Sequence, residues 1–271
     1  MKTIQLSTYI ISLIILFSAC QDVIDIDLDS VEPKLVIDGA VTDISDTLTI
    51  KLSKSVNYFD PGIYPGISGA NITVSDNLGN TSPLLETSPG TYSSYLPGIE
   101  GNEYTMTVET EGEEYTAKVT MPYKVEIDSL SFEPTPDYME FSGGYLVNCH
   151  LQDPAGIDNY YRIKVSGINQ TEEPDKVLFV YDDSFVDGNK ITLRWDDEQF
   201  FEQDTVVVEL QTLAESTYEY YRTLSALFED GMIGNANPAN PITNLSNNAL
   251  GYLGAFTVSR DTIIIPVQAT N

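Results

Sequence analysis

The sequence predicts a mainly β protein made of two β-sandwich-like domains, with a single helix in the second domain. Short runs that alternate apolar and polar residues recur from residue 34 onward, as in half-buried strands. Turn sequences such as Asp76–Asn80 and Glu111–Gly112 separate them, because Gly and Asn tolerate a positive φ. Hydrophobic residues make up 42% of the 271 residues, which is enough apolar material for a core.

Region 34–122 contains seven of these runs and ends at Pro122. The predicted strands are Lys34–Val41, Thr47–Ser53, Ala70–Ser75, Pro83–Glu86, Thr91–Tyr95, Glu103–Glu109 and Tyr115–Met121. Seven short strands in a region of this length are typical of an immunoglobulin-like sandwich. The sequence Gly69–Asp76, followed by Gly79, also resembles the carboxypeptidase-regulatory or transthyretin-like module, another seven-stranded sandwich. Both versions of the first domain stay open.

Region 123–271 is predicted to be a β-rich domain with one helix near 216–230. Its predicted strands are Ser129–Glu133, Tyr145–Gln152, Tyr160–Ser166, Val177–Tyr181, Lys190–Trp195, Thr205–Leu213, Leu253–Ser259 and Thr262–Val267. Ser216 and Glu219 have the spacing of a capping box, which favours a helix start. One helical face would then carry Tyr220, Leu224, Leu227 and Phe228, and Gly231 would end the helix.

Residues 1–19 are predicted to be an export signal. Lys2 supplies a positive start, and the apolar run 9–17 is shorter than the roughly 20 residues that a membrane-spanning helix needs. The tetrapeptide Phe17–Cys20 resembles a bacterial lipobox, in which the Cys becomes the new N-terminus. That resemblance implies a diacylglycerol and a fatty acid such as palmitate on Cys20, and several acyl chains suffice for stable anchoring.

Residues 20–33 form an acidic segment that we interpret as an extended tether. Asp25, Asp27 and Asp29 alternate with apolar residues, but Ser30 stands where a calcium loop starting at Asp25 would need Gly. Acidic residues after the lipidated Cys resemble the signal that sends Bacteroidota lipoproteins to the cell surface. We therefore expect an outer-membrane protein that faces the cell exterior, with the periplasmic leaflet as the open alternative.

Charge and residue counts exclude several function classes. Lys+Arg number 13 against 41 Asp+Glu, which gives a net charge of −28 and predicts no binding to nucleic acid. One His and two Cys leave little material for a zinc site or an imidazole-dependent enzyme. Cys149 and His150 are neighbours on a predicted strand, so their side chains should point to opposite faces. We expect no enzymatic activity.

Two groups of residues remain as candidate sites. Asp182, Asp183 and Asp187, with Gly188 easing the turn, are a candidate Ca²⁺ site, although a solvated turn is the simpler reading. Tyr58, Phe59 and Tyr64 lie in a loop rich in Pro and Gly. Exposed aromatic side chains are costly unless they meet a partner or fold back on the domain, so we expect contact with a partner or ligand.

Several segments resemble the domain-of-unknown-function family 4249. They are Cys20–Asp27, Lys34–Gly39, Asp182–Gly188, Asn237–Pro238, Asn244 and Leu253–Phe256. The resemblance implies an outer-membrane lipoprotein of Bacteroidota, often found beside a TonB-dependent receptor. It suggests an accessory or substrate-capturing subunit of such a receptor. The alternative is a structural or adhesive surface lipoprotein without a transporter partner.

Overall fold

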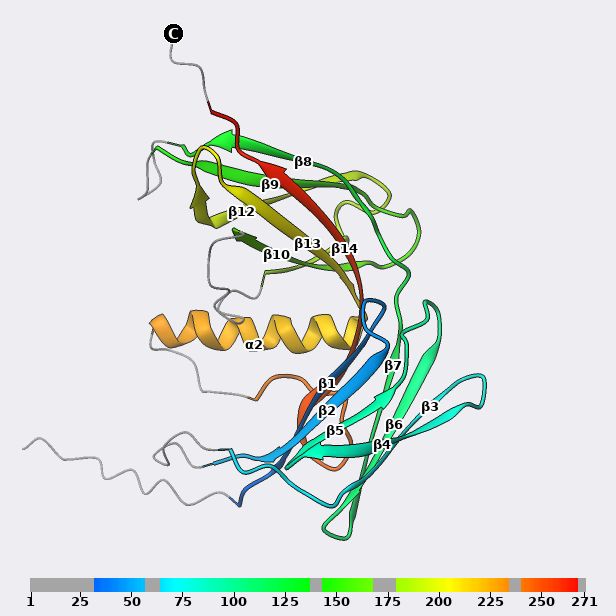
Figure 1. Ribbon diagram of the computed structural model, residues 1–271. Helices are drawn as coiled ribbons and strands as arrows, with labels where there is room; N and C mark the ends of the chain where they lie inside the picture. Colours follow the sequence, from blue (N-terminus) through cyan, green and yellow to red (C-terminus); the bar gives the residue numbers. More distant parts are fainter. Residues whose placement is uncertain (1–31, 57–63, 137–142, 168–178, 234–239, 268–271) are drawn as a thin grey trace, which may run out of the picture. The chain divides into compact units, whose positions relative to one another are not determined.

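The computed structural model describes residues 32–56, 64–136, 143–167, 179–233 and 240–267. Within these ranges the chain is mainly β with one helix, as the sequence predicts, and its strands form two sheets (Figure 1). The elements are β1 (Leu35–Thr42), β2 (Thr47–Lys54), β3 (Asn71–Asp76), β4 (Thr81–Ser88), β5 (Thr91–Tyr95), β6 (Glu103–Thr110), β7 (Glu113–Thr120), β8 (Ile127–Pro134), β9 (Tyr145–Gln152), β10 (Tyr160–Gly167), β11 (Val180–Asp182), β12 (Lys190–Phe200), β13 (Thr205–Leu213), α2 (Glu215–Ile233) and β14 (Leu250–Ile264).

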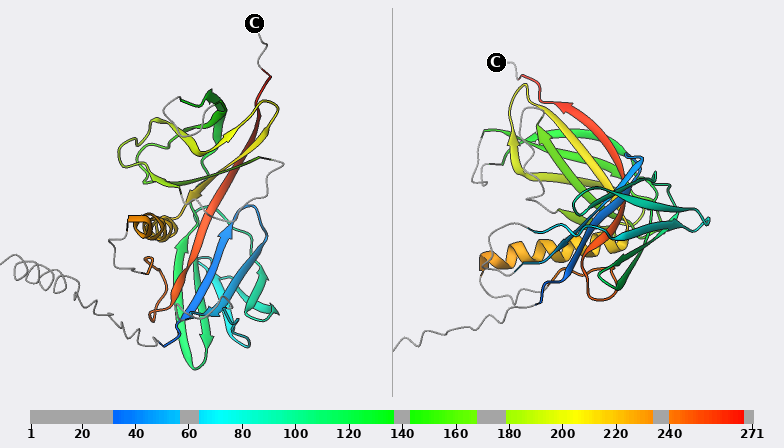
Figure 2. Two further views of the ribbon diagram at one scale, coloured as in Figure 1. Left: turned by 90° about the vertical axis from the view of Figure 1, so that its left-hand side faces the viewer. Right: turned by 60° about the horizontal axis from the view of Figure 1, so that its bottom comes forward.

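One large sheet joins both regions that the sequence predicts as domains. Its eleven strands follow the order β11-β10-β13-β14-β1-β2-β5-β4-β3-β6-β7, and β12, β9 and β8 form a second sheet. The first half of β14 pairs in parallel with β1, and its second half pairs antiparallel with β13. Figures 1 and 2 show this long strand running between the two groups of strands. The predicted division at Pro122 is not tested by this arrangement and stays a prediction.

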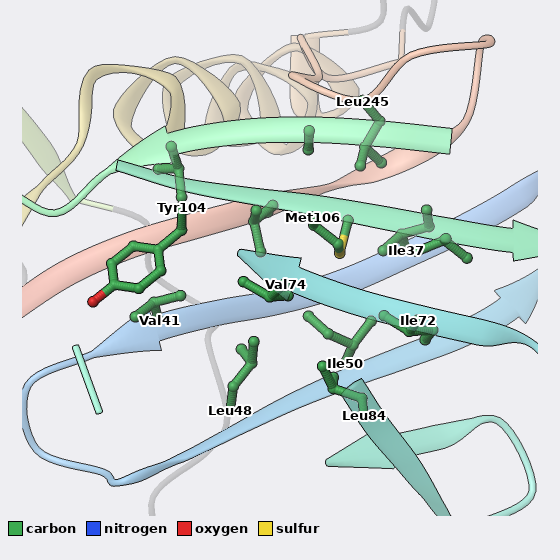
Figure 3. Packing of buried hydrophobic residues seen from close by; sticks show 14 of the residues in the cluster. Ile37, Val41, Leu48, Ile50, Ile72, Val74, Leu84, Tyr104, Met106 and Leu245 are labelled. Carbon is green, nitrogen blue, oxygen red and sulfur yellow. The ribbon is translucent and has the colours of Figure 1, made fainter. Parts of the chain in front are cut away.

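The first hydrophobic core lies between β1 and β2 on one side and β3, β6 and β7 on the other. Figure 3 shows Ile37 and Ile50 directed toward Ile72 and Met106 from the opposing strands. The alternation along each strand produces this packing, because every second side chain faces the core. Leu253 and Ala255 of β14 belong to the same core, so the C-terminal strand completes the packing of the N-terminal region.

The second core lies between the three-stranded sheet and the strands β10 and β13. Val147 and Cys149 of β9 and Trp195 of β12 are buried in it together with Ile163 and Val208. Between Met121, which belongs to the first core, and Val125, which belongs to the second, the chain passes through Pro122.

The two strands predicted at the C-terminus are one continuous strand. The polar residues Arg260 and Asp261 suggested a break, but they stay in the ladder opposite Glu209 and Val208 of β13. Arg260 also forms an ion pair with Glu209 at 2.6 Å, so a polar pair can occupy this position without ending the strand.

Two features hold the start of β14 in place beside β1. Gly251 has a φ of +89°, and a Cβ atom there would stand 2.0 Å from the carbonyl oxygen of Ile37. The Asn244 side chain accepts a hydrogen bond from Leu253 N–H at 3.1 Å and donates one to the Leu253 carbonyl at 2.9 Å. Asn244 thus acts like a neighbouring strand for this part of β14.

The helix α2 packs against β14, β10 and β11 on one side of the large sheet (Figure 2). Its contacts are largely aromatic: Tyr220 stacks on Tyr252 with ring centroids 4.3 Å apart, and the hydroxyls of Tyr221 and Tyr252 are 2.6 Å apart. The predicted capping box is wrong, because the Glu219 carboxylate pairs with Arg222 at 2.6 Å instead of reaching back. The predicted stop at Gly231 is also wrong, since the helix runs to Ile233.

No helix within the described residues combines the length and the apolar character that crossing a bilayer requires. The predicted signal 1–19 and Cys20 lie outside the described residues, as does the tether except for its last two residues.

Candidate functional site

Two loops of the C-terminal region meet at the ends of their strands. Loop 153–159 joins β9 to β10, and loop 183–189 joins β11 to β12. β9 pairs with β12 and β10 pairs with β11, so the two loops begin and end opposite each other. Backbone hydrogen bonds continue both pairings, from Asp153 N–H to the Asn189 carbonyl at 3.0 Å and from Asp183 N–H to the Asn159 carbonyl at 3.2 Å.

Three carboxylates come together where these loops meet. One oxygen from each of Asp153, Asp183 and Asp187 lies within 4.8 Å of the others. Asp153 is only 1% exposed and Asp183 4% exposed, whereas Asp187 is exposed. The cluster therefore has a buried side and one side open to solvent.

Hydrogen bonds from both loops fix the orientation of the carboxylates. Asp153 accepts one from the Tyr161 hydroxyl at 2.5 Å and one from Gly188 N–H at 2.8 Å. Asp183 accepts one from Asn159 N–H at 2.8 Å, and Asp187 accepts one from Gly156 N–H at 2.7 Å. A backbone N–H donor thus holds each of the three carboxylates in place.

The electrostatic setting of the cluster is unfavourable for two buried charges. Burial raises the pKa of Asp183 above its ordinary value, the hydrogen bond from Asn159 opposes the shift, and the charge of Asp153 adds to it. Burial and the hydrogen bond to Asp153 likewise raise the pKa of Tyr161. Across the described ranges no lysine or arginine forms an ion pair with any of the three carboxylates.

The carboxylate cluster differs from the predicted calcium set at one position. Asp182 lies outside the cluster, because it accepts hydrogen bonds from the Tyr218 hydroxyl at 2.8 Å and from the Ser184 hydroxyl. These bonds, with that from Ser184 the larger cause, lower the pKa of Asp182. Neighbouring side chains on an extended backbone point to opposite faces, which separates Asp182 from Asp183.

Asp153 takes the place that the sequence assigned to Asp182. It lies 30 positions before Asp183 in the chain, so no local motif connects the two. The signal that could have found it is the pairing of the predicted strands Tyr145–Gln152 and Lys190–Trp195, whose outer ends bring Asp153 beside loop 183–189.

The aromatic loop is only partly described. Tyr64 is 64% exposed, while Tyr58 and Phe59 lie outside the described residues. At the start of this loop Ser55 exchanges hydrogen bonds of 2.9 Å with Lys34, one through the Ser55 N–H and one through its hydroxyl. The loop therefore leaves β2 beside the residues that follow the acidic segment.

A further exposed aromatic side chain was not singled out from the sequence. Phe185 in loop 183–189 is 98% exposed and lies two residues from both Asp183 and Asp187. Phe185 stands in a polar turn sequence after Asp182 and Asp183, and nothing in that sequence predicted that its side chain is exposed.

Cys149 and His150 have different surroundings. Cys149 is buried in the second core, and burial raises its pKa to about 12. The His150 ring lies between two hydroxyls, with Ser131 Oγ 2.7 Å from Nε2 and Thr192 Oγ1 2.9 Å from Nδ1.

Comparisons with known proteins place the chain in a family without an assigned activity. Residues 21–262 match the family described as "Domain of unknown function (DUF4249)". A search among curated proteins gives no match. Among solved structures, a segment of two fibronectin type-III domains from chicken tenascin is similar, with 18% identity and a TM-score of 0.22, over 66% of this chain and 90% of that chain.

Proposed function

The chain belongs to the DUF4249 family, and from this premise we propose that it is a lipid-anchored outer-membrane protein that serves a TonB-dependent receptor as an accessory, substrate-capturing subunit. The observation that carries the proposal is where the family match begins. It starts at residue 21, directly after Cys20 and its lipobox-like sequence. The region shared with the family thus starts at the point where acylation would place the mature N-terminus.

The acidic segment then acts as the spacer between lipid and body. Residues 20–33 reach at most about 50 Å when fully extended. The body that follows stays close to the membrane surface, within reach of an integral β-barrel partner. The acidic residues repel anionic lipid as well as nucleic acid, so the charge of the protein does not hold it at the membrane. In this proposal the acyl anchor and the partner protein hold it there.

We place the partner contact on the aromatic loop that holds Tyr58, Phe59 and Tyr64. The loop starts beside Lys34, the residue that directly follows the tether. Tyr64 is exposed, and Tyr and Phe contribute strongly to binding when a partner buries them.

For the first domain we propose a seven-stranded sandwich of the immunoglobulin-like or transthyretin-like kind. Strands β1 to β7 lie on two sides of one core, which supports a sandwich. In this proposal β14 adds a further strand beside β1.

The anchor is tested by replacing Cys20 with Ala. We expect the variant to lose labelling by radioactive palmitate and to move from the membrane fraction to the soluble fraction. Cys149→Ala is the matched control, because it removes the other cysteine and should keep both label and membrane fractionation. Membrane retention of unlabelled Cys20→Ala protein would contradict the anchor.

The partnership is tested by purifying the protein from native membranes in mild detergent. We expect a β-barrel receptor to co-purify, and Tyr64→Ser to reduce its recovery. Tyr95→Ser is the control, since Tyr95 is similarly exposed but lies on β5. Recovery without any β-barrel protein, together with cell attachment by the purified protein, would favour the adhesive alternative.

A further inference from the structure

We infer that Asp153, Asp183 and Asp187, together with the side-chain oxygen of Asn159, form a binding site for a single Ca²⁺ ion. The site joins loops 153–159 and 183–189. It is independent of the proposed anchor and partner, because none of its residues belongs to the tether or to the aromatic loop.

The first argument is the uncompensated charge. Asp153 and Asp183 are almost completely buried, and both lie within 4.8 Å of a third carboxylate. Buried carboxylates are costly unless they are paired or bind a metal ion. Within the part of the chain that the structure describes, no basic side chain fills that role for these three residues. A divalent cation would neutralise the cluster.

The second argument is an orphaned oxygen beside the carboxylates. Asn159 is 6% exposed, and its Oδ1 is buried without a hydrogen-bond partner among the described residues. A buried polar atom left without a partner costs free energy, so such atoms call for an explanation. An amide oxygen is a good ligand for Ca²⁺, which would supply the missing partner.

Strand pairing places the Asn159 side chain on the same face as the Asp183 side chain. The register of β10 and β11 pairs Tyr160 with Asp182, and the hydrogen bond from Asp183 N–H to the Asn159 carbonyl continues it by one position. Directly opposite residues on antiparallel strands extend their side chains to the same face, about 4.5–5.5 Å apart at Cβ. The Asn159 N–H also donates to Asp183 Oδ2, which keeps the two residues together.

The ligand chemistry favours Ca²⁺ over transition-metal ions, and the spacing of the carboxylates is compatible with Ca²⁺. The four proposed ligands are all oxygens, with no sulfur or imidazole nitrogen that would favour zinc. Ligand oxygens on opposite sides of Ca²⁺ are about 4.6–5.2 Å apart, twice the metal–oxygen distance, whereas the smaller Mg²⁺ needs about 4.0–4.2 Å. One oxygen of each of the three carboxylates lies within 4.8 Å of the others, which is compatible with the Ca²⁺ span. Water reaching the cluster past the exposed Asp187 completes the six to eight ligands that Ca²⁺ takes.

The hydrogen bonds leave oxygen lone pairs free for the ion. Asp183 and Asp187 each use one carboxylate oxygen for a backbone donor and keep the other. Asp153 accepts one hydrogen bond on each oxygen, and each oxygen has a second lone pair. The backbone donors therefore orient the ligands without occupying all of their acceptor capacity.

Direct titration tests the site. The purified full-length chain is stripped with EDTA, exchanged into chelator-free buffer and titrated with CaCl₂ in a calorimeter. We expect one ion per chain with a Kd of about 10⁻⁴ M, as in extracellular calcium modules. At 10 mM CaCl₂ the Tm should rise by roughly 5–10 °C, because the ion binds the folded state alone. No heat and no change in Tm at 10 mM would overturn the proposal, as would equally tight binding of MgCl₂.

Variants locate the ion. Asp183→Asn should weaken Ca²⁺ binding by at least about 100-fold, since it removes a buried anionic ligand. Asp182→Asn is the matched control, because its carboxylate neighbours the site in sequence but bonds to Tyr218 and Ser184, and its Kd should stay within about twofold. Equal losses in the two variants would overturn the assignment.

A second variant keeps the test valid if Asp183→Asn fails to fold. Asp187 is exposed, so Asp187→Asn should fold normally and bind Ca²⁺ about tenfold more weakly. Wild-type affinity in folded Asp187→Asn would place the ion elsewhere and contradict the proposal.

Discussion

At position 251 the backbone of β14 runs so close to β1 that no side chain fits between the two strands. The glycine also has a left-handed φ of +89°, which side chains rarely allow. Both features occur where Gly251 pairs with Ile37 in the parallel register. The residue is thus needed for the pairing that connects the first and last strands of the body.

Replacing Gly251 with Ala should therefore destabilise the whole fold. We expect the free energy of unfolding to fall by about 2–5 kcal/mol, from backbone strain plus overpacking against the Ile37 carbonyl. Gly79→Ala is the control, since Gly79 has the same φ of about +90° but nothing within 4 Å of the added Cβ. It should cost only about 1–2 kcal/mol, which urea unfolding of both variants would measure. Equal losses would mean that the close approach to Ile37 does not matter.

At the scale of residues, the sequence located part of the carboxylate cluster. Asp183 and Asp187 stand in one short acidic turn, so composition and spacing could find them. Asp153 and Asn159 belong to another loop, and only the pairing of β9 with β12 and of β10 with β11 brings them near. Spacing in the sequence instead favoured Asp182. Its side chain points away from the cluster, because neighbouring side chains on an extended backbone face opposite sides.

At the scale of elements, the turn between β3 and β4 depends on one carboxylate. Asp76 accepts hydrogen bonds from Leu78 N–H at 3.0 Å, from Asn80 N–H at 2.9 Å and from the Asn80 side-chain amide at 2.7 Å. The side-chain bond from Asn80 is the largest cause that lowers the pKa of Asp76 below its ordinary value of 3.8. The charged form of Asp76 therefore stabilises the turn.

This contribution should disappear in acid. It is fully present above the unfolded pKa of about 3.9 and is lost as the pH falls through the lower pKa of the folded state. An NMR titration of the Asp76 carboxyl carbon should give a midpoint below 3.8 in the native protein. Asn80→Ala should raise that midpoint, and Asn71→Ala, at the other end of β3, should leave it unchanged. If the Asp76 midpoint were the same in Asn80→Ala as in the wild type, the hydrogen bond from Asn80 would not be the cause of the lowered pKa.

Strand bounds were predictable where the alternation of apolar and polar residues stopped at clear turn residues. The predicted bounds of Tyr145–Gln152 and Thr205–Leu213 are those of β9 and β13, because clear turn sequences flank both runs. The helix is present as predicted, but it begins at Glu215 and ends at Ile233, and Glu219 pairs with Arg222 instead of completing the capping box. β14 was split in the prediction because the pairing of Arg260 with Glu209 cannot be seen from one strand alone.

At the scale of the whole molecule, the sequence could not reveal the parallel pairing of β1 with β14. More than two hundred residues separate these strands, and neither sequence carries a sign of its partner. The large sheet and the first core both depend on that pairing. Alternation predicts which residues are buried, but it does not predict which distant strand covers them.

The first predicted domain should therefore not fold by itself. A fragment of residues 33–122 lacks β14, and with it the Leu253 and Ala255 side chains of its core. We expect this fragment to give the amide NMR spectrum of an unfolded chain, while residues 33–271 unfold in one cooperative transition. A well-dispersed spectrum from residues 33–122 would show that β14 is dispensable for this region.

Because β14 leaves the ribosome more than two hundred residues after its neighbour β1, the large sheet cannot close until β14 has been made. A pairing this remote in sequence also slows the search for the native state once synthesis is complete. Any product truncated before residue 250 would leave one edge of β1 unpaired and part of the first core exposed to solvent. Proteases would cleave such a chain more readily than the folded protein. Incomplete copies of the protein should consequently be degraded rather than accumulate as half-folded molecules.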